Sequence, residues 1–263
     1  MTAPFDLKHA TIAEQGIEYR AIAGSDPSKP ALVFLHEGLG STALWRDFPD
    51  QLCAATGCAG LIYSRFGYGG SDPCVLPRPL DYMQEEATNI LPALLAHFDI
   101  RNFILVGHSD GASIALVYAG LAEEISPKAV VVMAPHVFCE DISVAGIEDA
   151  QKAYEQGDLE EKLKKFHGIN TECAFRGWND AWLDPAFRSW NIETYLPAIT
   201  APVLAIQGRE DSYGTLRQIE KIERAIGGQF HKKILDKCGH NPWQEKRDDV
   251  LAYIVAFIRE PMF

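Results

Sequence analysis

The central part of the chain reads Phe103-Ile-Leu-Val-Gly-His-Ser-Asp-Gly-Ala-Ser-Ile-Ala-Leu-Val-Tyr118, an apolar run, a glycine-flanked serine and a helical run. Gly107 and Gly111 stand two residues before and two residues after Ser109. In this G-x-S-x-G pattern a sharp strand-to-helix turn lifts the serine hydroxyl clear of the sheet. The first turn of the helix offers unpaired N–H groups and a positive dipole end, which suit a developing oxyanion. The pattern therefore predicts a catalytic serine at this turn.

Similar apolar runs recur along the chain, as expected of parallel strands that helices cover on both faces. They fall at 31–35, 59–63, 129–134 and 202–207, and the last strand is expected at 230–235. Helical patterns lie between them at 42–56, 81–98, 215–226 and 245–259, and residues 7–23 alternate as in a hairpin. The order of these elements predicts an α/β fold with a mostly parallel, twisted sheet and helices on both faces.

The pattern changes between residues 136 and 197, where short helical pieces replace the strands. This segment is rich in aromatic residues, namely Phe175, Trp178, Trp182, Phe187, Trp190 and Tyr195. We expect a helical lid inserted into the α/β core, with 1–135 and 198–263 as the two parts of that core. Trp178 and Trp182 are then expected to line a substrate pocket. The alternative is that these aromatics only fill the interior of a small helical subdomain.

Length, composition and charge restrict the classes of protein to consider. The 263 residues suit one large domain or a core with a modest insertion, and 47% of them are hydrophobic. No apolar run is long enough for a membrane span, and no secretory signal is visible. Six cysteines without a C-x-x-C pair suggest reduced thiols in a cytoplasmic protein and no metal site. A net charge of −12 argues against a nucleic acid or an anionic membrane as partner, and the oligomeric state stays open.

A serine hydroxyl becomes a good nucleophile only when a base accepts its proton and a third group orients that base. Asp211 follows the apolar run 202–207, and His240 follows the strand expected at 230–235. Carboxyl ends of parallel strands share one edge of a sheet, where ligands bind in open α/β folds. Glu210 is the rival for the acid.

With these motifs the sequence resembles serine hydrolases of the α/β-hydrolase fold along nearly its whole length. The resemblance rests on G-H-S-D-G, G-R-E-D and C-G-H-N-P at the three catalytic positions, in the family's order. It implies that Ser109 is the nucleophile, His240 the base and Asp211 the acid. Asp211 is preferred to Glu210 because the family's acid usually comes three residues after the glycine that ends this strand, here Gly208.

The segment His36-Glu-Gly-Leu-Gly40 resembles the family's H-G-x-x-G loop. The resemblance implies an oxyanion hole made by the backbone amides of Gly38 and Asp110. Glu37 stands where the family usually has glycine, so its amide is the second choice.

A second departure is Ser64-Arg-Phe-Gly-Tyr-Gly-Gly-Ser71, which corresponds to the family's D-x-R-G-x-G-x-S. Ser64 and Phe66 replace the usual acid and the usual arginine. We expect this loop to be mostly structural.

The resemblance implies a cofactor-independent serine hydrolase that cleaves a small carboxylic ester or thioester through an acyl-enzyme. A C–C bond hydrolase or a lactonase could use the same triad. Haloalkane dehalogenases and epoxide hydrolases of this fold carry aspartate at the nucleophile position of the strand-to-helix turn. Ser109 at this position therefore disfavours their chemistry. From a different class, a non-catalytic ligand-binding protein could have kept the fold, although it would have no need of a complete triad.

Asp110 places a carboxylate beside the nucleophile, and its charge opposes a negative charge that develops nearby. One hypothesis gives it a structural partner, such as nearby backbone N–H groups or the lid arginines Arg176 or Arg188. The other is that Asp110 binds a cationic group of the substrate, such as an α-ammonium. The S-D-G variant is similar to that of biphenyl-hydrolase-like serine hydrolases, a branch associated with amino-acid esters.

Overall fold

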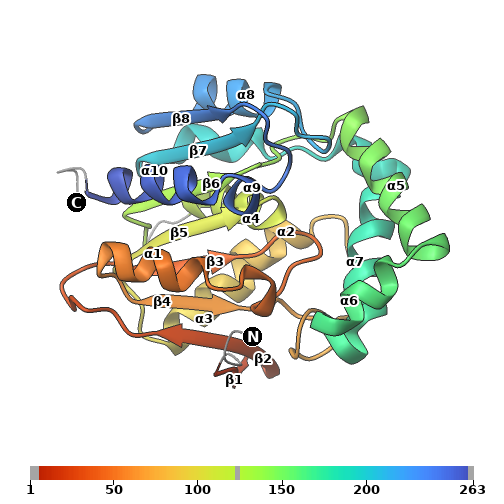
Figure 1. Ribbon diagram of the computed structural model, residues 1–263, viewed down its shortest axis with the longest axis horizontal. Helices are drawn as coiled ribbons and strands as arrows, with labels where there is room; N and C mark the ends of the chain where they lie inside the picture. Colours follow the sequence, from red (N-terminus) through yellow and green to blue (C-terminus); the bar gives the residue numbers. More distant parts are fainter. Residues whose placement is uncertain (1–5, 122–124, 260–263) are drawn as a thin grey trace.

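A computed structural model describes residues 6–121 and 125–259 and contains one eight-stranded sheet (Figure 1). The strand order is β1-β2-β4-β3-β5-β6-β7-β8. β1 pairs antiparallel with β2, and β2 with β4, whereas all the other neighbours are parallel. The strands are β1 Lys8–Ile12, β2 Gln15–Ile22, β3 Ala31–Leu35, β4 Gly60–Tyr63, β5 Phe103–His108, β6 Ala129–Met133, β7 Val203–Gly208 and β8 Phe230–Leu235. This sheet confirms the predicted fold class.

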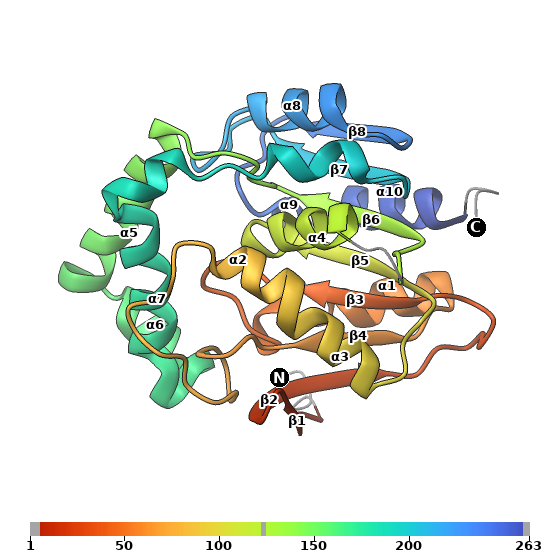
Figure 2. The ribbon, with the colours of Figure 1, turned by 180° about the vertical axis from the view of Figure 1, so that it is seen from behind.

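Helices cover both faces of the sheet, which explains why its central strands are apolar throughout. α1 (Phe48–Thr56) and α10 (Arg247–Arg259) lie on the face seen in Figure 1, whereas α3 (Leu91–His97) and α4 (Asp110–Leu121) lie on the opposite face (Figure 2). In β5, Phe103 and Leu105 pack into the core beneath α3 and α4, and the alternate residues Ile104 and Val106 pack into the core beneath α1 and α10. Successive side chains of a strand point to opposite faces, so burial on both faces requires a continuous apolar run.

The segment 136–197 contains three α-helices and no strand of the sheet. They are α5 (Asp141–Gln156), α6 (Leu159–His167) and α7 (Thr171–Leu183), and 3₁₀ turns follow at Pro185–Ser189 and Glu193–Ala198. Figure 1 shows α5, α6 and α7 stacked beyond the carboxyl ends of the strands, at the edge of the sheet where the motif loops lie. We refer to 136–197 as the helical segment.

Several helices are shorter or more divided than the sequence predicts. The pattern at 81–98 forms α2 (Tyr82–Glu85), a π-helical turn (Glu86–Ile90) and α3, because Pro92 has no N–H to continue the regular ladder. Residues 42–56 contain a 3₁₀ turn (Ala43–Trp45) before α1. α8 spans Arg217–Ala225, and the last helical pattern is preceded by a separate turn of helix, α9 (Pro242–Glu245). Within the described ranges, no helix is both long enough and apolar enough to cross a membrane.

Candidate active site

Ser109 lies on the turn between β5 and α4, and its backbone adopts a positive φ of 52°. Residues other than glycine rarely adopt this left-handed conformation, and it recurs where function requires it. A Cβ on Gly107 would overlap the carbonyl of Gly111, and a Cβ on Gly111 would overlap the carbonyl of Leu35. The two glycines therefore allow β5, α4 and the neighbouring strand to approach closely enough to form the turn.

The three residues predicted to form a triad meet in one hydrogen-bonded chain. Nε2 of His240 lies 2.9 Å from Oγ of Ser109, and Nδ1 of His240 lies 2.9 Å from both carboxylate oxygens of Asp211. Both distances suit the arrangement in which Ser109 donates to Nε2 and Nδ1–H donates to the acid. The carboxyl ends of β5, β7 and β8 bring these side chains together.

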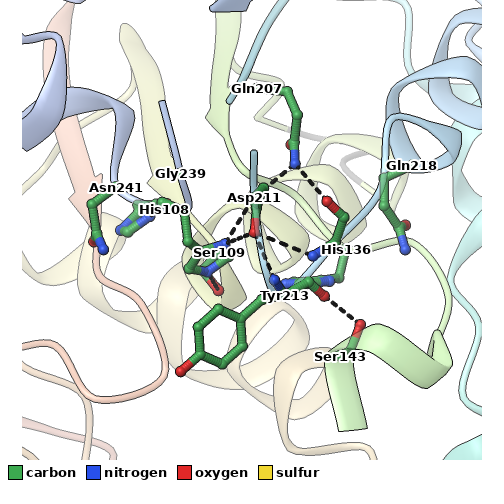
Figure 3. A network of polar contacts seen from close by, with 12 residues as sticks. His108, Ser109, His136, Ser143, Gln207, Asp211, Tyr213, Gln218, Gly239 and Asn241 are labelled. Atoms are coloured by element: carbon green, nitrogen blue, oxygen red, sulfur yellow. Dashed lines mark hydrogen bonds and ion pairs between the residues drawn. The ribbon is translucent and has the colours of Figure 1, made fainter. Parts of the chain in front are cut away.

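Asp211 is held in place by three further donors (Figure 3). Gln207 Nε2 donates to Oδ2 at 2.8 Å, and the amides of Tyr213 and Gly214 donate to Oδ1 at 2.8 Å and 3.2 Å. Burial alone raises the pKa of Asp211, but the hydrogen bond and charge of His240 and the Tyr213 amide outweigh it and lower that pKa below its ordinary value. The acid is therefore ionised at neutral pH and can stabilise an imidazolium.

The loop after β3 is fixed through the carbonyl of Glu37. This oxygen accepts hydrogen bonds from Arg65 Nη2 at 2.9 Å, from His36 Nδ1 at 2.7 Å and from the Gly40 amide at 3.0 Å. In a trans peptide the C=O of one residue and the N–H of the next point in opposite directions. The N–H of Gly38 therefore points away from these donors.

A cavity of about 190 Å³ lies at Ser109 and is lined by residues from the strand ends and from the helical segment. Its apolar wall includes Trp178 and Trp182 of α7, which the sequence analysis placed there, and Leu39 and Ile147. Its other lining residues are Glu37, Gly38, Ser109, Asp110, His136, Ser143, Tyr213, His240 and Asn241. The candidate nucleophile thus faces a small, partly aromatic cavity that suits a compact substrate.

The family pattern described as "Alpha/beta hydrolase family" matches residues 32–253, which include the whole site. The chain belongs to the alpha/beta hydrolase family. It is 33% identical to the proline iminopeptidase of Lactobacillus helveticus over 102 residues, which are 38% of this chain and 34% of that protein. The match thus spans about a third of the length of that relative. Epoxide hydrolase 3 of Xenopus tropicalis is 21% identical over 283 residues, covering 94% of this chain and 76% of that protein.

Solved structures share the fold of this α/β-hydrolase. An esterase from Exiguobacterium antarcticum superposes with a TM-score of 0.75 and 17% identity, over 96% of this chain and 99% of that one. MGS-M2, an alpha/beta hydrolase from a deep-sea metagenome library, superposes with a TM-score of 0.72 and 22% identity, over 95% and 96% of the two chains.

Asp110 has structural partners other than the two lid arginines that the sequence suggested. Its side chain is fully buried, accepts a hydrogen bond from the Tyr82 hydroxyl at 2.6 Å and lies 3.6 Å from Nη2 of Arg65. The lid arginines are not its partners, because Arg176 pairs with Glu155 and Asp180, and Arg188 pairs with Asp141. Tyr82 and Arg65 are therefore the structural partners of Asp110. Its other carboxylate oxygen, Oδ1, has no hydrogen-bond partner among the described residues, and Asp110 lines the cavity, so binding of a substrate ammonium stays a prediction.

His136 is a further residue of the site that was not predicted from the sequence; it lies just past the end of β6 and lines the cavity. Its ring is centred 5.7 Å from the ring of His240. Burial is the main cause that lowers the pKa of His136 to about 3, so the ring is neutral. The available signal was its place after a predicted strand, which it shares with the predicted site residues.

The loop 64–71 also contacts the two segments that are predicted to form the oxyanion hole. Arg65 is almost wholly buried and contacts the carbonyl of Glu37 and the carboxylate of Asp110. One guanidinium therefore joins the two segments predicted to supply the oxyanion amides. The usual arginine position of this motif is Phe66, so the cation stands one residue earlier than the family pattern implies.

Proposed function

We propose that this α/β-hydrolase is a serine hydrolase that cleaves a small carboxylic ester or thioester through an acyl-enzyme. The observation that carries the proposal is the continuous chain from Ser109 through His240 to Asp211, which opens into the cavity. Each member has the partner that its role requires, and Asp211 is ionised.

Catalysis starts when Oγ of Ser109 attacks the substrate carbonyl and transfers its proton to Nε2 of His240. The imidazolium is stabilised by Asp211 and gives the same proton to the leaving alcohol or thiol, which leaves the acyl group on Ser109. Water then attacks the acyl-enzyme while Nε2 accepts one of its protons. Collapse of the second tetrahedral intermediate returns that proton to Oγ and releases the acid.

The negative oxygen of both intermediates would be stabilised by the amides of Gly38 and Asp110. Among the described residues, neither amide donates a hydrogen bond to another backbone carbonyl outside the regular elements. Fixed donors of this kind each supply on the order of 3 kcal/mol of transition-state stabilisation. The Glu37 carbonyl, held by Arg65 and His36, orients the Gly38 amide, which favours Gly38 over Glu37 as the donor.

Arg65 is therefore predicted to be a positioning residue for the oxyanion hole. Arg65→Met should lower kcat for an activated ester by roughly 10- to 100-fold with little change in KM, because only transition-state binding suffers. Arg65→Lys keeps the charge and should recover part of the loss. Affinity for a trifluoromethyl ketone should fall in parallel with kcat/KM. A variant that melts earlier but keeps its kcat would show that Arg65 only supports the fold.

Trp178 is predicted to limit the acyl group. Its indole packs directly against Gly38 and lines the cavity, so Trp178→Ala should favour longer acyl chains by about tenfold in kcat/KM. The matched control is Trp190→Ala. Trp190 stacks on Phe187, with ring centroids 5.3 Å apart, and is not among the cavity residues. A series of p-nitrophenyl esters of increasing chain length measures the preference, and equal preferences in both variants would assign Trp178 to the core.

The names of the relatives imply that different bonds are cleaved, including a peptide bond and an epoxide. The residue at the nucleophile position distinguishes these reactions, since an epoxide hydrolase of this fold is expected to carry aspartate where this chain has Ser109. Serine instead supports acyl transfer.

A fluorophosphonate tests the proposed function directly. Oγ of an activated serine displaces fluoride from phosphorus, and we expect one stable adduct per chain on the peptide that contains Ser109. Heat-denatured protein, in which the hydrogen bond to His240 is lost, should stay unlabelled. An adduct on a different residue, or none on the folded protein, would refute the proposal.

A further inference from the structure

Two cysteines that are far apart in the sequence meet where the helical segment contacts the core. Cys74 lies in the loop between β4 and α2, and Cys173 lies in α7, 99 residues away. Their Sγ atoms are 2.8 Å apart, and the Cys74 amide donates to Sγ of Cys173 at 3.4 Å. Both residues are partly exposed, so a small reagent can reach them.

The local backbone leaves room for this pair. Gly67 has a φ of +83°, and a Cβ there would lie 2.7 Å from Sγ of Cys74 and 2.8 Å from Sγ of Cys173. Any side chain at this position would displace one of the sulfurs. Because a disulfide has an S–S distance of about 2.05 Å, bond formation needs an approach of less than about 1 Å.

Arg78 makes the two sulfurs chemically different. Its Nη2 donates to Sγ of Cys74 at 3.0 Å and to the carbonyl of Phe66 at 2.8 Å. The hydrogen bond from Cys173 is the main cause that lowers the pKa of Cys74 to about 6, with the charge of Arg78 acting in the same direction. The pKa of Cys173 is raised. At neutral pH the pair therefore shares one proton, and the guanidinium places the negative charge on Cys74.

The other cysteines provide a contrast within the same chain. Burial is the main cause that raises the pKa of Cys53 to about 12, that of Cys238 to about 11, and that of Cys139 above its ordinary value. Thiols of this kind react slowly with oxidants, because the thiolate is the reactive species.

We propose that Cys74 and Cys173 are a site of reversible oxidation, at which hydrogen peroxide produces a disulfide between the core loop and α7. The Cys74 thiolate attacks one oxygen of the peroxide, so the O–O bond breaks, the sulfur is oxidised to a sulfenic acid, and the departing hydroxide takes a proton from the solvent to become water. The Cys173 sulfur then attacks the sulfenic sulfur, the S–O bond breaks, and a second water leaves with the Cys173 proton. The two sulfurs together lose two electrons, which reduce one peroxide to two waters.

The disulfide would tie the wall of the cavity to the core, because α7 also carries Trp178 and Trp182. A crosslink across 99 residues restricts the unfolded chain strongly. We expect the apparent melting temperature to rise by roughly 5–15 °C. This inference does not depend on the proposed hydrolytic activity, since its readouts are covalent mass and melting temperature.

The experiment treats the full chain with a small excess of hydrogen peroxide, blocks the remaining thiols with iodoacetamide and maps the peptides by mass spectrometry. Wild type should give a Cys74–Cys173 disulfide, a higher melting temperature, and full reversal of both by dithiothreitol. Cys173→Ser should stop at a sulfenic acid on Cys74, which dimedone traps. Cys74→Ser should give neither product.

Cys139→Ser is the matched control, because Cys139 is a partly exposed cysteine of the helical segment whose pKa is raised by burial, and it should behave as wild type. If a serine variant does not fold, the alanine variant at the same position takes its place. Arg78→Lys keeps a cation near Cys74 and should form the disulfide, whereas Arg78→Gln should form it more slowly. Over-oxidised Cys74 without a disulfide in wild type, or a disulfide that involves another cysteine, would overturn the proposal.

Discussion

Ser109→Ala is expected to lower kcat for an activated ester by about 10⁴- to 10⁶-fold and to abolish labelling by the fluorophosphonate. The substitution removes the atom that attacks the carbonyl while leaving His240, Asp211 and the oxyanion amides in place. Ser109 is 6% exposed and its Oγ has the required hydrogen bond to His240, so the methyl group of alanine fits without displacing neighbours. The residual rate then reflects binding and oxyanion stabilisation alone.

Ser143→Ala is the matched control, because Ser143 also lines the cavity but donates its hydroxyl to the carbonyl of Tyr213. We expect only a small change in kcat from this variant. Steady-state kinetics and melting temperatures of both proteins measure the difference. If Ser109→Ala kept more than a few per cent of the activity, the nucleophile would lie elsewhere.

The sequence predicted the strands and the position of the site because both depend on local patterns. Wholly apolar runs identify strands that are covered on both faces, and β5 carries such a run directly before Ser109. Asp211 and His240 follow two further strands, and parallel strands bring their carboxyl ends to one edge of the sheet. Three local signals therefore implied one spatial cluster.

The partners of Asp110 could not be predicted in this way. Tyr82 belongs to a short helix at the start of an interrupted helical pattern. Arg65 belongs to a loop that was expected to be mostly structural. Nothing in the sequence around Asp110 identifies Tyr82 or Arg65 as a partner, because these contacts form only when separate segments of the chain pack together. Sequence reasoning therefore sought arginines in the helical segment, whose side chains pair instead with acids near them.

The lining of the cavity shows the same limit. His136 follows a predicted strand as Asp211 and His240 do, but it has no adjacent glycine motif to distinguish it from a structural histidine. Its place in the cavity wall and the distance of 5.7 Å between its ring and that of His240 put it in the site. Residue type and local pattern identify catalytic groups that belong to a motif. Residues that line a pocket can be identified only from the packed structure.

Asp211→Asn is expected to lower kcat by about 10⁴-fold, whereas Glu210→Gln should retain most of the activity. Both substitutions replace a carboxylate by an amide at neighbouring positions, so they are closely matched. Glu210 is exposed, and its carboxylate accepts a hydrogen bond from the Cys238 amide at 2.6 Å. In the part of the chain that the structure describes, the side chain of His240 is hydrogen-bonded to Asp211 and Ser109 and not to Glu210, so substitution of Glu210 leaves the triad intact.

The surroundings of Asp211 explain why an amide there disables the base. The amides of Tyr213 and Gly214 donate to Oδ1, so they would fix the carbonyl oxygen of the new asparagine at that position. Its NH₂ group would then replace Oδ2, 2.9 Å from Nδ1 of His240, and could donate to that nitrogen. Gln207 can turn its unpaired Oε1 toward the same NH₂, so the fold is expected to survive.

The imidazole of Asp211→Asn would thus carry its proton on Nε2, where it cannot accept the proton of Ser109, and the charge that stabilises the imidazolium is absent. For Asp211→Asn we expect an unchanged melting temperature and a strongly reduced kcat. Both variants are measured with the same activated ester. The opposite pattern, an active Asp211→Asn and an inactive Glu210→Gln, would move the acid by one residue. Equal, modest losses in both variants would mean that His240 does not depend on a carboxylate for its orientation, and the proposed triad would be wrong.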